Sequence, residues 1–434
     1  MKCMLRLVLL TALNASLLQA GGFQLNESGT KAVGMASAYS AGSGGDASTL
    51  FYNPAGMTKL ATGLTLTGGV SLISPGARFY GPTNYNTTQT MTELEAWSFP
   101  IPNFYAVYNM PESNLAFGLG VFVPFGLGTK FPDTWSGRNL AIRTYLETIT
   151  INPNVAYSLL DGKLSVAAGL SYSMGRVELS QKATAPFEQE TLVELTGKGN
   201  AMSWNLGVSY ELSKSLRIGA SYRNNIKIKY DGDVKYTANP AVSSLFVAGG
   251  GGTDLNLPYD FRLGLNYAVD HNLRVEFGLD YVGWSSYDTL KINFNRRPGA
   301  PFITNPDGTK SDNNFTLANP RNYQNQFVVR LGAEYDLSPT FTVRAGAVFD
   351  PAPVESKFTQ PFLPDADRFG ASVGFSYKIS NSFTLDAAYF GINGFTRTVV
   401  GESRGDGLPT TSNNFDGVYK AWANIGSLGF SLTL

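Results

Sequence analysis

Few side chains in this sequence could perform covalent or metal-dependent chemistry. The chain has one cysteine, Cys3, and one histidine, His271, which lies in a two-residue connection between strand patterns, where a solvated turn residue is expected rather than a catalytic base. A lipid-cleaving barrel would need a Ser–His pair on its outer wall, and we find none. Asp307-Gly308 and Asp406-Gly407 have the composition of loop turns rather than of calcium loops. We therefore expect no enzyme activity, no bound metal and no cofactor.

A glycine run at Gly249–Gly252 follows an apolar stretch. It lacks the Lys and Ser/Thr of a phosphate-binding loop, so flexibility is the better interpretation. Lys+Arg and Asp+Glu both number 33, so no basic field would attract nucleic acid.

Apolar side chains occur instead in the segments between strand patterns, where water-facing loops are usually polar. We expect these residues to capture an apolar ligand. Packing of the loops on each other is the alternative for any single residue. The residues are Phe125, Leu127, Phe131 and Trp135 in one segment, Phe187, Leu192 and Leu195 in a second, and Leu245, Phe246 and Val247 in a third.

The first residues of the chain predict its compartment. Lys2 and Arg6 precede the largely apolar stretch 7–18, and a small-residue cleavage pattern ends at Ala20. This pattern is typical of a secretory signal peptide at residues 1–20, with the mature chain beginning near Gly21. Cys3 lies inside the signal, so we expect a mature chain without thiol chemistry.

A period of two dominates the chain from Thr62 to the C-terminus, with apolar and polar residues alternating as on the two faces of a strand. In the last pattern, Leu428, Phe430, Leu432 and Leu434 share one face. The alternation predicts about fourteen strands. They lie near residues 62–73, 97–110, 114–123, 147–159, 163–179, 200–212, 215–230, 254–269, 272–294, 323–337, 340–350, 367–379, 382–397 and 418–434.

The connections between these strands alternate between short and long. A soluble sandwich would also show alternating faces, but long strands, an even strand count and alternating connections favour an outer-membrane barrel. After the signal, no apolar run of about 18 residues predicts a spanning helix. The expected fold is therefore all-β: a fourteen-stranded antiparallel transmembrane β-barrel over residues 61–434.

Residues 21–60 show no period of two. A barrel of this size encloses more volume than its own side chains fill, so we expect this segment to form an internal plug, or hatch. Asn53-Pro54-Ala55 joins plug to wall. A turn in which Pro54 fixes φ would explain the motif on its own.

Several motifs together resemble the FadL-type long-chain fatty acid transporter family, which also includes aromatic-hydrocarbon uptake proteins. The resemblance covers essentially the whole mature chain. Its motifs are Gly22–Glu27, Asn53–Ala55, Leu257-Pro258, Gly283–Ser285 with Leu290-Lys291, and Pro364–Phe369.

The resemblance implies a plugged barrel in the outer membrane of a Gram-negative bacterium. It implies ligand-gated diffusion of a long-chain fatty acid, or a similar hydrophobic compound, with release sideways into the membrane. A neutral aromatic hydrocarbon is the alternative ligand, and a general porin or structural barrel is the alternative function. The expected partners are this ligand, outer-membrane lipid and the barrel-assembly machinery, with no nucleic acid, and the expected state is a monomer.

The resemblance also implies site residues. A lysine and an arginine meet the ligand carboxylate and match Lys291 and Arg176, while Phe23 matches an aromatic residue of the pocket. An anion in an apolar pocket does need a paired cation. The alternating pattern switches its apolar parity between Tyr281 and Leu290, which predicts that Lys291 faces the lumen. Arg176 shares the parity of lipid-facing residues, so it requires a bulge or a position above the hydrocarbon.

A kinked third strand provides the lateral opening in the family. Here Gly118, Gly120, Pro124 and Gly126 would permit such a kink, because Pro cannot donate to the ladder and glycines allow a bend. We hypothesise that Asn53-Pro54-Ala55 packs on the barrel interior and positions the hatch beneath this opening. Two departures are a short predicted loop at 180–199 and a final Leu434 in place of the usual aromatic, which bears on assembly efficiency.

Overall fold

The computed structural model describes residues 22–81, 91–184, 190–240, 243, 248–295, 303–304, 310–311, 314–355, 359, 363–399 and 417–434. The signal peptide prediction for residues 1–20 and the capture residues Phe187, Leu245, Phe246 and Val247 lie outside these ranges. In the part that is described, no helix is both long and apolar enough to cross a membrane.

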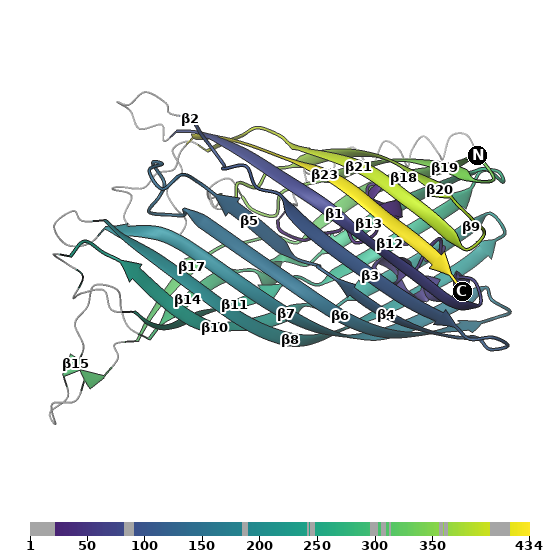
Figure 1. Cartoon of the computed structure of the whole chain (residues 1–434), viewed down its shortest axis with the longest axis horizontal. Coiled ribbons are helices and arrows are strands. Elements are labelled where there is room, and N and C mark those ends of the chain that lie inside the picture. The colour runs from purple at the N-terminus through teal and green to yellow at the C-terminus, as the bar shows by residue number, and fades with distance from the viewer. Residues whose placement is uncertain are drawn as a thin grey trace, which may run out of the picture.

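The strands form a closed antiparallel barrel of 14 strands, as predicted (Figure 1). The last strand closes the barrel by pairing with the first, from Thr65↔Thr433 to Tyr80↔Val418. Several wall strands consist of two segments in succession. In chain order the wall is β1 (Gly63–Tyr80), β3 (Phe99–Asn109), β4 (Leu115–Phe122) with β5 (Gly126–Lys130), β6 (Arg143–Leu159), β7 (Leu164–Thr184), β8 (Glu190–Ser213), β9 (Leu216–Arg223) with β10 (Ile226–Thr237), β11 (Gly249–Leu257) with β12 (Asp260–Ala268), β13 (Leu273–Val282) with β14 (Thr289–Phe294), β17 (Phe315–Pro320) with β18 (Gln326–Ser338), β19 (Phe341–Asp350), β20 (Arg368–Lys378), β21 (Phe383–Gly394) with β22 (Arg397–Val399), and β23 (Gly417–Thr433).

Short extra strands lie at one end of the barrel. β2 (Met91–Glu93) extends the pairing of β1, and β15 (Ile303–Thr304) pairs with β16 (Lys310–Ser311) away from the wall. Tight connections, such as residues 160–163 and 214–215, lie at the opposite end, together with the C-terminus (Figure 1). We call these the long-loop end and the short-turn end; in outer-membrane barrels they face outside and periplasm, respectively.

A row of aromatic rings crosses the outer face of neighbouring strands part of the way along the barrel. Ring centroids are 5.2 Å apart for Trp204 and Tyr222, 6.1 Å for Tyr222 and Tyr259, 6.2 Å for Tyr259 and Tyr281, and 4.9 Å for Tyr281 and Phe327. Aromatic rings of this kind mark the edge of the hydrocarbon in membrane barrels. We refer to these five residues as the aromatic row.

On the short-turn side of the aromatic row, apolar residues face outward and polar residues face inward. In β8, Leu206 and Val208 are exposed on the outer face, whereas Asn205 and Ser209 are buried inside. On the long-loop side the polarity inverts: Ile228 is buried inside and Lys229 is exposed outside. The alternation in 254–269 would place Leu255 and Leu257 on the same face as Phe261 and Leu263, but Leu255 and Leu257 of β11 are buried in the interior, whereas Phe261 and Leu263 of β12 are exposed outside.

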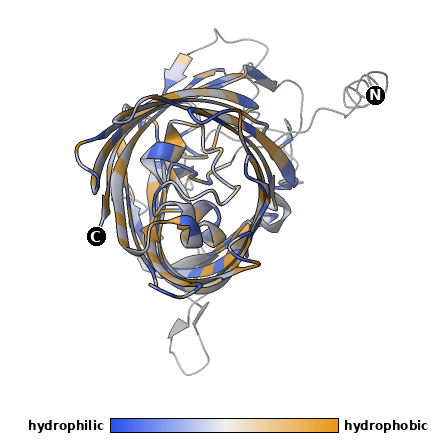
Figure 2. Cartoon of the chain, turned by 90° about the vertical axis from the view of Figure 1, so that its right-hand side faces the viewer, coloured by the Kyte–Doolittle hydropathy of each residue, from blue (hydrophilic) through white to orange (hydrophobic). Residues whose placement is uncertain are grey.

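The plug, residues 22–60, lies inside the barrel, where Figure 2 shows its short helices within the ring of strands. It contains α2 (Thr30–Val33), α3 (Thr49–Tyr52) and the 3₁₀ helix η2 (Pro54–Lys59). Polar wall residues bind its backbone: the Ala36 amide donates to Ser372 Oγ at 2.8 Å and the Ala41 amide to Glu276 Oε1 at 2.9 Å. A Cβ built on Gly264 would lie 2.2 Å from the Ala41 nitrogen, so glycine there allows the plug to touch the wall.

Candidate functional site

The third wall strand is interrupted between β4 and β5. β4 pairs with β3 on one side and with β6 on the other, but β5 continues the pairing with β6 alone. The three residues between them, Val123, Pro124 and Phe125, include a proline that has no N–H to donate. The wall therefore lacks a ladder between β3 and β5, and we call this interruption the wall break.

The predicted kink residues divide into two groups. Pro124 and Gly126 lie at the wall break. Gly118 and Gly120 do not, because they belong to the regularly paired part of β4. A Cβ on Gly118 would meet Met57 Sδ at 2.3 Å and one on Gly120 would meet Leu50 at 2.9 Å. These two glycines make room for the plug rather than bend the strand.

The start of the plug pairs with the wall break. The Leu25 amide donates to the Pro124 carbonyl at 2.9 Å, and the Gly126 amide donates to the Phe23 carbonyl at 3.1 Å. Gln24 and Phe125 form the antiparallel bridge between these bonds. Residues 22–25, here called the N-terminal segment, thus supply part of the backbone pairing that the wall itself lacks.

Phe23 lies in an aromatic cluster behind the wall break. It is 4% exposed. Its ring centroid lies 5.1 Å from Trp284, 5.3 Å from Tyr287 and 6.2 Å from Phe125, in edge-on arrangements that aromatic pairs favour. Phe23 is thus packed among aromatic rings on the inner side of the wall break.

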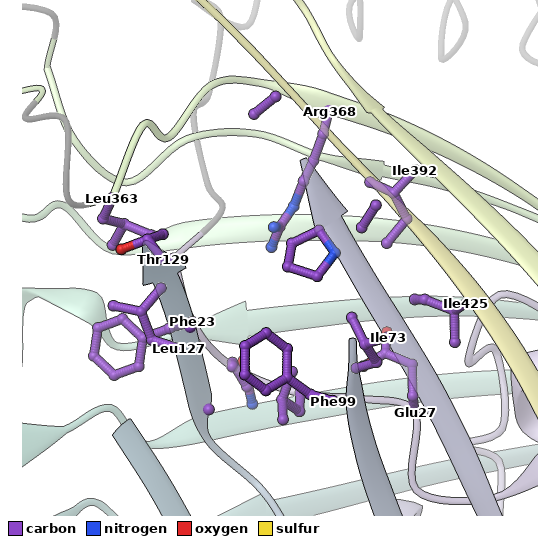
Figure 3. Close-up of a pocket in the computed structure, with 18 of the residues that line it drawn as sticks. Phe23, Glu27, Ile73, Phe99, Leu127, Thr129, Leu363, Arg368, Ile392 and Ile425 are labelled. Atoms are coloured by element: carbon purple, nitrogen blue, oxygen red, sulfur yellow. The ribbon is translucent and has the colours of Figure 1, made fainter. Parts of the chain in front are cut away.

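A cavity of about 320 Å³ opens behind the wall break, between the N-terminal segment and the wall (Figure 3). This volume is at the small end of the range for ligand pockets. Most of the side chains around it are apolar, including Phe23, Ile73, Phe99, Leu127, Leu363 and Ile425.

Two described cations line this pocket, and both have acidic partners. Arg330 is 4% exposed; it donates to Asp280 Oδ2 at 2.7 Å and to the Ala36 carbonyl at 2.8 Å. Arg368 points into the pocket (Figure 3), with its Nε 2.8 Å and its Nη2 2.7 Å from Asp350 Oδ2. The Arg368 side chain retains 25% exposure, which makes it the more accessible of the two.

Sequence reasoning did not assign Arg368 to the pocket. The signal was present, since Arg368 belongs to the Pro364–Phe369 motif on which the resemblance rests.

Asp365 holds the beginning of the N-terminal segment at the rim of the pocket. Its Oδ2 accepts a hydrogen bond from the Gly22 amide at 2.9 Å. Burial raises the pKa of the Asp365 carboxyl to about 6, and the Arg368 charge and the Gly22 amide oppose that rise. Burial also raises the pKa of Glu27, against the nearby charge of Arg330.

The two cations expected to meet a ligand carboxylate face away from the pocket. Arg176 is 55% exposed on the outer face of β7 and forms an ion pair with Glu178. Lys291 is exposed on the outer face of β14, whereas its neighbour Leu290 is buried inside. The predicted lumen position of Lys291 is wrong because the parity switch reflects inverted polarity beyond the aromatic row rather than a rotation of the strand.

The predicted loop at 180–199 is also wrong. β7 and β8 pair through Thr184↔Glu190, so Leu192 and Leu195 lie within a strand. Leu195 is 3% exposed and joins the apolar interior together with Val177. Phe131 and Trp135 of the first predicted capture segment are buried and stacked on each other, with centroids 4.2 Å apart.

The Asn53-Pro54-Ala55 motif packs on the inner face of β8. Asn53 Nδ2 donates to the Ser40 carbonyl at 2.9 Å and to the Val208 carbonyl at 3.0 Å, and Asn53 Oδ1 accepts from the Ala55 amide at 3.1 Å. Pro54 lies against Gly207, where a Cβ would come within 2.8 Å of Pro54 Cδ. The motif thus packs on the barrel interior, but on β8 rather than at the wall break.

The sequence and the fold are similar to those of known proteins. Over 407 residues the chain is 25% identical to a long-chain fatty acid transport protein of Escherichia coli (strain K12), covering 85% of this chain and 86% of that protein. The solved structure of a Pseudomonas aeruginosa FadL homologue shares the fold with a TM-score of 0.80 at 19% identity, over 95% of this chain and 100% of that one. The Pseudomonas putida toluene transporter TodX does so with a TM-score of 0.70 at 15% identity, over 95% and 99%.

The family model described as "Outer membrane protein transport protein (OMPP1/FadL/TodX)" matches residues 11–434. Nearly the whole sequence is therefore included, from the plug to the last wall strand. The chain belongs to this family of outer-membrane transport proteins for hydrophobic compounds.

Proposed function

We propose that this protein takes up long-chain fatty acids by ligand-gated diffusion and releases them sideways through the wall break into the membrane. One observation carries the proposal: an apolar pocket lies directly behind a gap in the wall, and the N-terminal segment pairs with the strand at that gap. This route favours a ligand that is more soluble in lipid than in water, because the ligand need not pass the polar part of the plug at the short-turn end.

Gating follows from competition between the ligand and Phe23. The pocket is small, and Phe23 fills space beside it. An acyl chain that needs this space binds better once Phe23 has moved, so ligand binding shifts the population toward the displaced segment. Moving Phe23 also disturbs the two hydrogen bonds that join the N-terminal segment to Pro124 and Gly126.

Arg368 is the cation that we assign to the carboxylate. It is the more exposed of the two cations at the pocket, and its guanidinium points into it. The carboxylate of a bound fatty acid would bind Arg368 together with Asp350 or in its place. Arg368 would then supply the charged hydrogen bond that a buried anion needs.

A neutral aromatic hydrocarbon is the second candidate ligand. The observation in its favour is that Arg176 and Lys291 face outward, while Arg368 already has a carboxylate partner in Asp350. A neutral ligand would leave that ion pair intact and would use only the apolar and aromatic walls.

Binding of oleate and of toluene to the purified protein distinguishes the two candidates. Arg368→Gln should weaken oleate binding roughly 10- to 100-fold, the loss of one charged hydrogen bond, and leave toluene binding unchanged. Lys291→Gln is the matched control and should change neither affinity. Unchanged oleate binding by Arg368→Gln would contradict the carboxylate assignment and favour the neutral ligand.

A further inference from the structure

Four of the exposed lysines on the outer face of β8, β10 and β14 lie close together. Strand register places them on neighbouring strands, which Figure 1 shows side by side: Lys198 pairs with Asp231, and Lys229, Asp254 and Lys291 form one cross-strand row. Lys227 lies two residues before Lys229 on β10. We call Lys198, Lys227, Lys229 and Lys291 the outer lysine patch.

The outward direction of each lysine follows from its buried neighbours in the strand. Ile228 and Tyr230, on either side of Lys229, are 0% exposed in the interior. Leu290, next to Lys291, is also buried, at 8% exposure. All four lysines are exposed. The patch thus lies on the opposite side of the wall from the pocket and is independent of the proposed transport.

The height of the patch along the barrel is that of lipid headgroups. The patch lies on the long-loop side of the aromatic row, which marks the edge of the hydrocarbon, and Lys227 is five residues beyond Tyr222 of that row. On β8, the strongly exposed Met202 and then Lys198 follow Trp204 toward the long-loop end. The distance from Trp204 to Lys198 along the strand is about 20 Å, at about 3.3 Å per residue. Met202 is about 7 Å from Trp204 along the strand. An apolar contact and a cation therefore occur in succession on one strand beyond the aromatic row.

Acidic neighbours cancel the charge of the patch only in part. Asp231 and Asp254 lie among the four lysines. Lys229 forms an ion pair with Asp231 at 3.2 Å, but both side chains are more than 70% exposed, so water screens the pair. Within the described part of the chain, no ion pair involves Lys198, Lys227 or Lys291. Lysine is a strong binder of phosphate as a point charge.

The spacing of the patch suits a ligand with more than one phosphate. Lys229 and Lys291 are two strands apart, or about 10 Å, and Lys198 lies diagonally from Lys229 at about 7–8 Å. We propose that the outer lysine patch binds the phosphate groups of a phosphorylated glycolipid in the outer leaflet, with its acyl chains against Met202 and Trp204. Such binding fixes the level at which the wall sits in the membrane and leaves the pocket free.

The test compares lipid A, which carries two phosphates, with enzymatically dephosphorylated lipid A on the full-length protein in detergent. The variant Lys198→Gln/Lys227→Gln/Lys291→Gln should bind lipid A at least tenfold more weakly than the unmodified protein. The dephosphorylated lipid should bind the unmodified protein as weakly as lipid A binds the variant. Added salt should weaken only the phosphate-dependent binding. Oleate binding should not change.

The matched control removes the same number of charges at the short-turn end, through Lys163→Gln/Lys214→Gln/Lys378→Gln, where the three lysines are also exposed. It should bind lipid A normally. Heat-dependent electrophoretic mobility checks that both variants form barrels. Equal lipid A binding by the patch variant and the unmodified protein overturns the proposal. Loss of oleate binding with lipid A binding intact also overturns it, since the patch would then attract the transported anion.

Discussion

On the short-turn side of the aromatic row the barrel wall presents apolar side chains to lipid and polar side chains to the plug, whereas on the long-loop side both preferences are reversed. Leu206 outside and Asn205 inside represent the first region, and Lys229 outside and Ile228 inside represent the second. The same backbone ladder serves both regions. The comparison teaches that a strand of period two has two faces, but that the medium on each side decides which face is apolar.

The contents of the barrel follow the same division. On the short-turn side, charged wall residues hold the plug by hydrogen bonds: the Ala41 amide donates to Glu276 Oε1 at 2.9 Å, and Arg223 donates to the Phe51 carbonyl at 3.1 Å. On the long-loop side, here called the upper region, apolar and aromatic contacts surround the pocket, where Phe23 touches Trp284 and Tyr287. An apolar ligand therefore finds a matching interior only in the upper region, and the lower plug can stay in place while the N-terminal segment moves.

The largest expected effect comes from locking the upper region. In Gln24→Cys/Phe125→Cys, the two positions face each other as a bridge pair without direct hydrogen bonds, a close approach that suits a disulfide. Oxidation should abolish uptake of a labelled fatty acid by cells, and reduction should restore it, because the N-terminal segment can no longer leave the wall break. The single-cysteine variants are the controls. Full uptake by the cross-linked protein would place the exit elsewhere.

A second, smaller effect should separate the outer faces of the two regions on one strand. Leu206→Arg puts a charge into the hydrocarbon and should lower the free energy of unfolding by about 2–4 kcal/mol. Thr196→Arg lies on the same face of β8 beyond the aromatic row and should cost less than about 1 kcal/mol. Urea unfolding in lipid vesicles measures both. Similar costs would mean that the aromatic row does not mark the membrane edge.

The smallest of the three effects concerns pH and the upper region. In the closed state, in which the N-terminal segment is bound at the wall break, the pKa of Asp365 is raised to about 6, above its ordinary value. The closed state is therefore favoured most below the ordinary pKa, and this preference is lost as pH rises through about 6; the part lost between pH 4 and pH 7 is about 2 kcal/mol. If release exposes Asp365, release should be easier at pH 7 than at pH 4.

Protease cleavage near the N-terminal segment, measured against pH, reports this release. Asp365→Asn should flatten the profile. An unchanged profile in that variant would show that another group titrates.

The wall could be predicted from the sequence because its strand patterns depend on local alternation, which is independent of what lies beyond each face. The site could be predicted only in part. Lys291 was misplaced because inverted polarity and a shifted strand give the same sequence pattern. Gly118 and Gly120 were misassigned because a glycine that permits a bend and one that admits a neighbour, here Met57 and Leu50, look alike in sequence.

Arg368 differs from Lys291 in this respect. Its charge is readable in the sequence, but its position depends on contacts far along the chain, since β19 supplies Asp350 and the plug supplies Gly22 beside Asp365. No local sequence pattern encodes such long-range contacts. Phe23 could be placed only by resemblance, for the same reason.

The contacts between the plug and the wall also constrain the order of assembly. Thr30 Oγ1 lies 2.9 Å from Ser427 Oγ of the final strand, and the Gly22 amide donates to Asp365, so the plug binds parts of the chain that are synthesised last. Contacts of such long sequence separation are slow to form, because closing a long loop costs entropy. We therefore expect these plug contacts to form only after the last wall strands are in place.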